Sequence, residues 1–421
     1  FKMFWTVARK EIISNLLSYK FFIVILLTIL LISTSFFIMH RDYKERLSDY
    51  HIIKPGSDEP IAVIPPNPLS IFSKGLEENM TRSFEISVIS ITTRSGQKSG
   101  NLLFSFFSVP DFLYIVKVVL SLVALLFGFD QVSRERERGT LKLIFANPIS
   151  RAKVLFGKWM GNFLCVSVPF LLVTLIGIGI FNLDTDIRFS SGNLIRMAVI
   201  IFISLVYIAF FLSLGIFISA LTKKAATSVV ILLFVWALVV FVMPNLGTLL
   251  ARQFVDVPSV KALSEKRQQT WTREVLLGIT DRKTGISSWE DRYKTIYSDM
   301  DKLEEDYRNK FNRLVRLSKN INRISPVASF IYAVTEIAGT GIGEESNLKR
   351  AVVSYKNSIF SDVISANLQH EKKEYPAFIY HRRSLSRVFA DGALFDAAWM
   401  IFFNVIFFVL SYFIFVKYDV R

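Results

Sequence analysis

Long apolar runs alternate with polar stretches along this chain, and six of the runs match the length of a membrane-spanning helix. Such a helix needs about 20 mostly apolar residues to cross roughly 30 Å of hydrocarbon. The pattern therefore predicts an all-α polytopic membrane protein with six transmembrane helices. The predicted spans are residues 20–40, 110–130, 154–181, 194–221, 225–244 and 393–416.

The stretch 41–109, after the first span, is too polar and too rich in proline to form one helix. Five prolines lie between residues 55 and 68, and proline breaks a helix interior. Phe84, Ile86 and Val88 alternate with polar residues, which is the pattern of a strand. We predict a small, partly β insert outside the membrane.

A larger polar insert, residues 249–392, separates the fifth and sixth spans and is predicted to be helical. Ser287 and Glu290 fit a capping box, and apolar residues then recur every three or four positions. This predicts a helix of about 35 residues, roughly 50 Å long. Residues 324–341 are too short and broken to span, so they predict a helix at the outer membrane surface or the packing base of the insert. The apolar stripe of the long helix requires a partner, and the candidates are residues 259–279, residues 346–370 or another subunit.

Residues 1–19, before the first span, have the pattern of an amphipathic helix. Trp5, Ala8, Ile12 and Leu16 fall on one helical face. We predict an interfacial helix on the cytoplasmic membrane surface. The alternative is a polar lead into the first span.

The charge distribution orients these elements. The chain is 52% hydrophobic and 20% charged, with a net charge of +15. Its short inner segments are net basic, and basic residues beside short loops mark the cytoplasmic side. We therefore expect a membrane protein with both termini in the cytoplasm and both inserts outside. No nucleic-acid recognition motif accompanies the positive charge, which favours contact with anionic membrane lipid instead.

The sequence lacks the motifs of a nucleotide, metal or redox site. Its one cysteine, Cys165, excludes a disulfide framework and a cysteine-based metal centre. Gly157–Lys158 resembles the end of a phosphate loop, but Ala152 replaces the first glycine and Trp159 replaces the required Ser or Thr. We therefore expect no catalytic residue, metal or cofactor in this chain. The spans also hold few acids or bases for a proton relay, so a partner would supply the energy for transport.

The segment 131–153, between the second and third spans, concentrates alternating charge. Gly139 suits a left-handed helix end, and Thr140 is predicted to cap the short helix that follows. Such a segment can form ion pairs internally or offer them, with an apolar patch, to a partner. The alternative is a solvated loop that only sets the topology. Gly157 and Gly161, in a G-x-x-x-G pattern, predict close subunit packing. The candidate coupling residues are Arg134, Glu135, Arg136, Glu137, Arg138, Gly139, Thr140 and Leu141.

Residues 133–158 carry the pattern S-x-E-x-E-x-G-T-L-x-L-x-x-x-x-P-x-S-R-x-x-x-x-x-G-K. This pattern resembles the first cytoplasmic loop of the type-2 ABC transporter permeases, where the loop forms the coupling helix that docks on the ATPase subunit. The resemblance implies a dimer of permeases, expected here to be a homodimer rather than a heterodimer, with two separate ATPase chains that hold ATP and Mg.

Residues 66–78, PNPLSIFSKGLEE, carry a second resemblance. They resemble a subset of these permeases with large extracytoplasmic inserts, including those in maturation systems for copper enzymes. We interpret the segment itself as a surface loop packed under the insert.

Two functions of different classes fit these features. The first is the membrane-spanning permease subunit of a bacterial ABC transporter, which performs export or ATP-driven mechanical work across the inner membrane and couples to a separate ATPase through 131–153. Its outer inserts would bind a substrate or a periplasmic or cell-surface protein. The alternative is a membrane-anchored scaffold or sensor that recruits an extracytoplasmic partner through 249–392 without transport.

Overall fold

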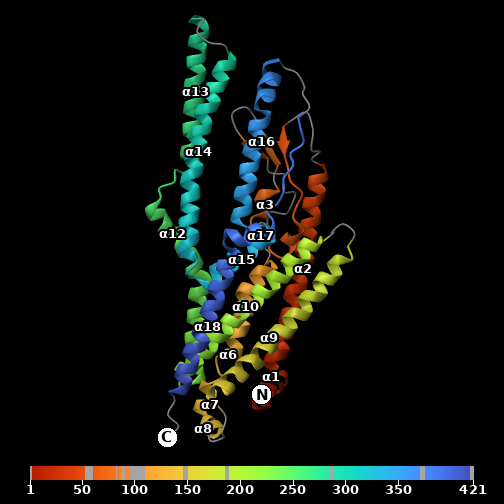
Figure 1. The fold of residues 1–421 in the computed structure, drawn as a ribbon, viewed down its shortest axis with the longest axis vertical. Coiled ribbons are helices and arrows are strands. Elements are labelled where there is room, and N and C mark those ends of the chain that lie inside the picture. Colours follow the sequence, from red (N-terminus) through yellow and green to blue (C-terminus); the bar gives the residue numbers. More distant parts are fainter. Residues whose placement is uncertain are drawn as a thin grey trace.

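The computed structural model of the chain is an elongated bundle of helices with a second group of helices extending from one end (Figure 1). The termini and the short helices α7 and α8 lie at the opposite end, here called the loop end. The structure describes residues 2–52, 60–81, 83–86, 91–94, 110–145, 150–184, 189–284, 289–369 and 375–417.

Six helices among the described residues are long and apolar enough to cross a membrane, which confirms the predicted all-α polytopic fold. Three of the spans are continuous helices: α2 (Tyr19–Ile52), α9 (Arg151–Asn182) and α10 (Ser191–Leu221). The other three each contain a π-helical segment. The second span comprises α5 (Phe112–Tyr114), η2 (Ile115–Leu120) and α6 (Ser121–Gly128). The fifth comprises α11 (Ala225–Ala237), η3 (Leu238–Val242) and α12 (Met243–Phe254). The sixth comprises α17 (Leu385–Val388), η4 (Phe389–Ala393) and α18 (Leu394–Val416).

The fourth span, α10, is the centre of the bundle. It packs against α6, α9 and α18, and its apolar window is 78% buried, against 17% for the fifth and sixth spans. The fifth and sixth spans therefore present most of their surface to lipid or to another chain. Gly128 of α6 and Gly215 of α10 let two backbones meet, because a Cβ on Gly128 would lie 3.0 Å from the Cα of Gly215.

The two inserts, predicted as separate elements, pack into one unit. Strands β1 (Ile61–Ala62), β2 (Ser83–Ile86) and β3 (Ile91–Arg94) form an antiparallel sheet in the order β1-β2-β3, which confirms the partly β first insert. Phe84 and Ile86 of β2 pack against Leu348 and Val352 of α16 (Ile342–Gln369), which belongs to the second insert. We use the name insert body for the unit formed by the three strands and five helices, which are α3 (Glu77–Met80), α13 (Val260–Thr284), α14 (Trp289–Asn322), α15 (Pro326–Ala338) and α16. Val88, predicted in the strand, lies outside the described residues.

The long helix predicted in the second insert is α14 (Trp289–Asn322), and its partners are within the chain. It pairs with α13 (Val260–Thr284) through Arg267 and Glu304, and with α16 through the Tyr297 hydroxyl, which lies 2.5 Å from Oδ1 of Asn357. It also packs on α12, the end of the fifth span, a partner that the sequence did not indicate. Ser287 of the predicted capping box lies outside the described residues.

The apolar segment 324–341 is the packing base of the insert body. Its helix α15 (Pro326–Ala338) is buried between α10 and α18, and Phe330 stacks on Tyr207 of α10 with ring centroids 4.1 Å apart. Of the two predicted positions, the packing base is confirmed.

The interpretation of residues 66–78 as a surface loop is wrong. The segment forms η1 (Pro68–Ile71) and α3 (Glu77–Met80), and Ile71, Phe72 and Glu77 are completely buried. Asn67 donates from Nδ2 to the carbonyl of Ala338 at 2.6 Å, and Arg382 donates to Glu77 at 3.3 Å. Burial raises the pKa of Glu77, and Arg382 opposes that rise. The segment is the buried junction between the first insert and α15.

A buried ion pair fixes the end of α14 to the sixth span. Arg323 donates from Nε to Oδ1 of Asp396 at 2.7 Å and from Nη2 to Oδ2 at 3.2 Å, and the Asp396 side chain is 1% exposed. Gly392 has φ +121°, and a Cβ there would lie 2.5 Å from Nη2 of Arg323. The glycine therefore leaves room for the guanidinium.

Replacing Gly128 by Leu should loosen the packing of α6 on α10. Overpacking a close helix contact costs about 1–3 kcal/mol, so the thermal unfolding midpoint of the purified chain in detergent should fall. The matched control is Gly179→Leu, since a Cβ at Gly179 meets no atom within 4 Å. Equal midpoints for the two variants would contradict the close contact.

Candidate functional site

The segment between the second and third spans folds back against the loop end of the bundle. Helix α7 (Ser133–Glu137) follows a turn, and α8 (Thr140–Phe145) follows Gly139. Gly139 has φ +72°, the predicted left-handed conformation, which glycine adopts without strain. Thr140 does not cap α8 as predicted. It is the first residue of that helix, and its hydroxyl donates to the carbonyl of Glu135 at 3.3 Å, so it holds α8 against α7.

A buried lysine lies beneath α7. Lys158 of α9 is 3% exposed, and its Nζ lies 2.6 Å from Oε1 of Glu135 and 3.3 Å from Oε1 of Glu11. These three charges join α7, α9 and α1 (Lys2–Leu16). A buried charge is costly to leave unpaired, and removing one member of such a group typically costs about 3–5 kcal/mol. Glu135 is therefore an anchor of the loop rather than a surface charge.

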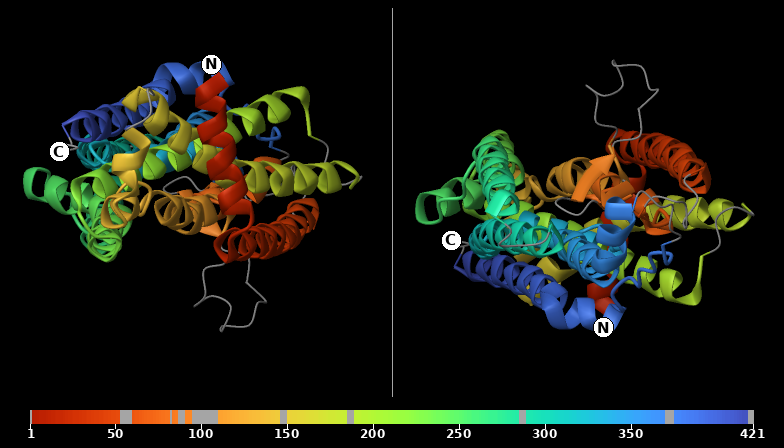
Figure 2. Two further views of the ribbon diagram at one scale, coloured as in Figure 1. Left: turned by 90° about the horizontal axis from the view of Figure 1, so that it is seen from below. Right: turned by 90° about the horizontal axis from the view of Figure 1, so that it is seen from above.

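Helix α1 lies crosswise over the loop end of the bundle (Figure 2), which agrees with an interfacial orientation. On the predicted apolar face, Trp5 and Leu16 are 56% and 46% exposed, whereas Ala8 is buried against α9.

Gly157 and Gly161 of α9 lie where α1 packs closely against α9. A Cβ on Gly157 would lie 2.9 Å from Cγ1 of Val7, and one on Gly161 would lie 2.8 Å from Cβ of Glu11. The predicted close helix approach is present, but the approaching helix is α1 of the same chain rather than a helix of a second subunit. The two glycines bring Glu11 within reach of Lys158.

Side-chain amides extend this cluster toward the second span. Oδ1 of Asn162 accepts from Nδ2 of Asn15 at 2.8 Å and from Nε2 of Gln131 at 3.2 Å. Nδ2 of Asn162 donates to the carbonyl of Lys158 at 2.7 Å. The amides fix α1, the start of the loop and α9 relative to one another.

The loop is also bonded to the tight turn between the fourth and fifth spans. Oγ of Ser219 accepts from the backbone N–H groups of Val132 and Ser133, both at 3.0 Å. Arg136 donates from Nη1 to the carbonyl of Thr222 at 3.0 Å. Oε2 of Glu137 accepts from the N–H of Ala225 at 3.2 Å, at the N-terminus of α11, where a negative charge is favourable.

The loop also contacts the first and sixth spans. Lys20 of α2 and Arg134 of α7 both pair with Asp130, at 3.1 Å and 2.5 Å. Nη1 of Arg151 donates to the carbonyls of Phe415 and Val416, at 3.3 Å and 2.5 Å, at the end of α18. The segment from Asp130 to Arg151 thus contacts or continues into all six spans.

The candidate coupling residues divide into two groups. Glu135, Arg136 and Leu141 face the bundle, and Leu141 is completely buried. The exposed residues are Arg134, Glu137, Arg138, Gly139 and Thr140. Beside them, Leu143 of α8 is 69% exposed. The structure therefore gives this segment an anchored inner face and a charged outer face with an apolar centre.

Sequence reasoning missed Glu11, Asn162 and Gln131, and did not predict that Lys158 is buried and paired. The available signals were an acid within the basic helix 1–19 and a lysine and asparagine at one helical spacing within an apolar run. Neither signal identifies which residue each side chain contacts, because the contacting residues lie up to 147 positions apart in the chain.

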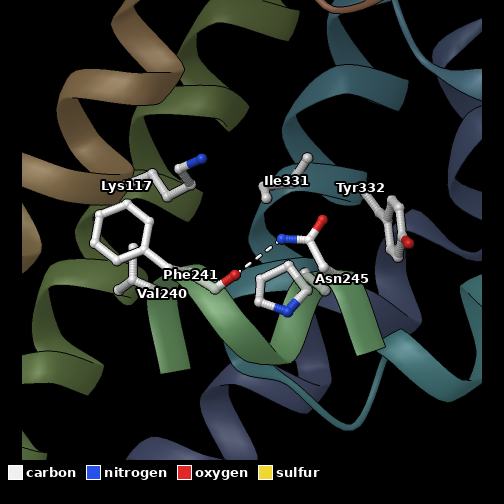
Figure 3. A pocket seen from close by; sticks show the side chains of 8 residues that line it. Lys117, Val240, Phe241, Asn245, Ile331 and Tyr332 are labelled. Atoms are coloured by element: carbon white, nitrogen blue, oxygen red, sulfur yellow. Dashed lines mark hydrogen bonds between the residues drawn. The ribbon is translucent and has the colours of Figure 1, made fainter. Parts of the chain in front are cut away.

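A cavity of about 260 Å³ lies at the other end of the spans (Figure 3). Lys117 of η2, Asn245 of α12 and Tyr332 of α15 provide its polar groups, and Phe241 and Ile331 provide apolar walls. Two π-helical segments, η2 and η3, and Pro244 adjoin it. Such irregular turns are common sites of helix bends.

Comparison with known proteins identifies the family. The family described as ABC-2 family transporter protein matches residues 5–420. The chain is 35% identical over 72 residues to the probable ABC transporter permease protein NosY of Pseudomonas aeruginosa, and 31% identical over 100 residues to the protein of the same description from Stutzerimonas stutzeri. These matches cover 17% and 23% of this chain, and 25% and 34% of the two relatives, so they span no more than about a third of the relatives' length. Because the family match extends over nearly the whole chain, this six-span protein belongs to the ABC-2 transporter family.

Proposed function

We propose that this chain is the permease subunit of an ABC transporter and that a separate ATPase, which holds ATP and Mg, docks on α7 and α8. The observation that carries the proposal is the connection of one short segment to all six spans through buried ion pairs and hydrogen bonds. The NosY relatives are described as probable ABC transporter permeases, which supports the same function.

The outer face of α7 and α8 has the chemistry of a docking surface. Leu143 is an exposed apolar anchor, and Glu137 and Arg138 are exposed charges beside it. Interfaces commonly combine an apolar centre with a polar rim. An ATPase that grips this face and changes shape would push on α7 and α8 as one unit, because Thr140 and Glu135 hold the two helices together.

The inner face transmits the displacement. A buried lysine held between two carboxylates moves only together with its partners, since separation would leave unpaired charges away from water. Movement of α7 therefore shifts α1 and α9 through Lys158, and shifts the α10–α11 turn through Arg136 and Glu137. The π-helical segments beside the cavity of Figure 3 are the proposed sites where the second and fifth spans bend.

The proposal also includes the orientation in the membrane, the oligomeric state and the process that ATP hydrolysis drives. The loop end faces the bacterial cytoplasm, and the insert body lies outside the inner membrane. Two copies of the chain act as a homodimer through the exposed fifth and sixth spans. The ATPase cycle drives export, or mechanical work on a periplasmic or cell-surface protein bound to the insert body.

Replacing Leu143 by Asp should abolish recovery of an ATPase with the tagged chain from native membranes in mild detergent. The substitution places a charge at the centre of the proposed contact. The matched control is Leu183→Asp, which changes a leucine that is 83% exposed at the opposite end of α9. Absence of any ATPase with the unaltered chain would instead favour the membrane-anchored scaffold or sensor.

Lys158→Met should lower the thermal unfolding midpoint, because Glu11 and Glu135 remain buried without their cation. The triple variant Glu11→Gln, Glu135→Gln, Lys158→Met removes all three charges and should recover much of that stability. We expect it to retain the ATPase but to hydrolyse ATP in membranes at a reduced rate. A stable triple variant with the unaltered rate would show that these charges do not transmit the motion.

A further inference from the structure

A cleft of about 460 Å³ lies at the base of the insert body and is lined by residues of α14, α15, α16 and the start of the sixth span. It is distinct from the loop end and from the cavity of Figure 3, and its lining is mostly charged. The helices that form it belong to sequence segments that begin far apart, from residue 289 to residue 385.

The floor of this cleft is a satisfied ion-pair cluster. Arg383, whose side chain is 6% exposed, donates to Glu336 at 2.5 Å, to Glu344 at 2.8 Å and to Asp391 at 3.0 Å. Lys319 adds a contact to Glu336 at 3.4 Å. Burial by itself would raise the pKa of Glu336, but Lys319, Arg383 and the N–H of Gly343 hold that pKa below its usual value. The floor therefore stays charged and rigid.

The cations at the rim differ from those of the floor, because they have no carboxylate partner in the described part of the chain, although Nη2 of Arg350 lies 3.5 Å from Oδ1 of Asn347. Arg316 of α14, Arg350 of α16 and Arg387 of α17 are exposed and line the same cleft. Among the residues that the structure describes, no carboxylate lies within 4.0 Å of any of these three guanidinium groups. Three arginines from three helices line one cleft, and a bound anion would supply the counter-charge that they lack.

The number and type of these cations indicate which anion fits. Guanidinium groups bind phosphate and carboxylate oxygens in a planar, two-pronged geometry. A single carboxylate has two oxygens, whereas a phosphate group offers three or four oxygens that can meet separate arginines at once. We propose that this cleft binds a phosphate group, carried by a phospholipid headgroup or by a soluble phosphate ester.

The position of the cleft allows either source. Arg387 and Asp391 begin the sixth candidate span, and Leu394 and Phe395 just beyond them are 58% and 54% exposed. A lipid whose headgroup occupied the cleft would have exposed apolar residues along its acyl chains. The inference does not depend on the coupling of an ATPase at the loop end.

The test is titration calorimetry on the purified full chain in detergent, with three probes. Glycerol phosphate represents a soluble ester, dihexanoyl-phosphatidylglycerol represents a lipid, and dihexanoylglycerol lacks the phosphate. The triple variant Arg316→Gln, Arg350→Gln, Arg387→Gln should raise the Kd of the bound phosphate probe at least about tenfold, because each charge-assisted hydrogen bond lost contributes measurably. The matched control is Lys302→Gln, Lys310→Gln, Arg313→Gln, which removes the same charge from exposed positions of α14 outside the cleft.

The two probes separate the sources. Tight binding of the lipid with weak binding of glycerol phosphate supports a headgroup site, and similar binding of both supports a soluble ester. Each single Arg→Gln variant provides a second test if the triple variant does not fold. The proposal is overturned if no phosphate probe binds more tightly than dihexanoylglycerol, or if the cleft variants and the control variant give the same Kd.

Discussion

The ammonium group of Lys158, held between Glu11 and Glu135 with almost no access to water, is the interaction on which the loop end depends. A charge in such a place must be paired, and the pairing dictates where three helices lie. Gly157 and Gly161 have no side chain because α1 must come close enough to deliver Glu11. Helix α7 must turn back because it carries Glu135. Gln131, Arg136 and Arg151 of the same segment then reach other spans through hydrogen bonds.

The same physical constraint recurs at the insert end. Arg323 and Asp396 join α14 to the sixth span, Arg382 and Glu77 join the two inserts, and Arg383 with its three carboxylates forms the base of the insert body. Arg196 of α10 donates to the carbonyl of Ile337 at 2.7 Å, so the central span is tied to this base as well. Both ends of the bundle are thus held by buried polar groups, whereas its middle is held by apolar packing around α10.

The contrast between buried polar contacts at the two ends and apolar packing in the middle affects how the helices of the bundle can move. Apolar contacts are non-directional and tolerate sliding, whereas buried ion pairs keep their partners together. A displacement at α7 would therefore carry the bonded ends of the spans with it, and the change would be absorbed where the helices are irregular. Those places are η2, η3 with Pro244, and η4, each near the insert end of a span. The rigid insert body would then move as one unit relative to the loop end.

The hydrophobic pattern by itself determined the six spans, the partly β first insert and the long helix α14, because length and periodicity are local properties of the chain. The positive φ at Gly139 was predictable for the same reason. The loop between the second and third spans was recognisable as a candidate site, but the division of its residues was not. Which carboxylate points inward depends on Lys158 and on α1, which are distant in sequence. The burial of residues 66–78, the joining of the two inserts and the arginine-lined cleft were likewise decided only by tertiary packing. From sequence alone, a charged residue is predicted to be exposed to solvent, because the oppositely charged residue that would allow its burial is brought close only by the fold. The energy of a buried ion pair depends on both members.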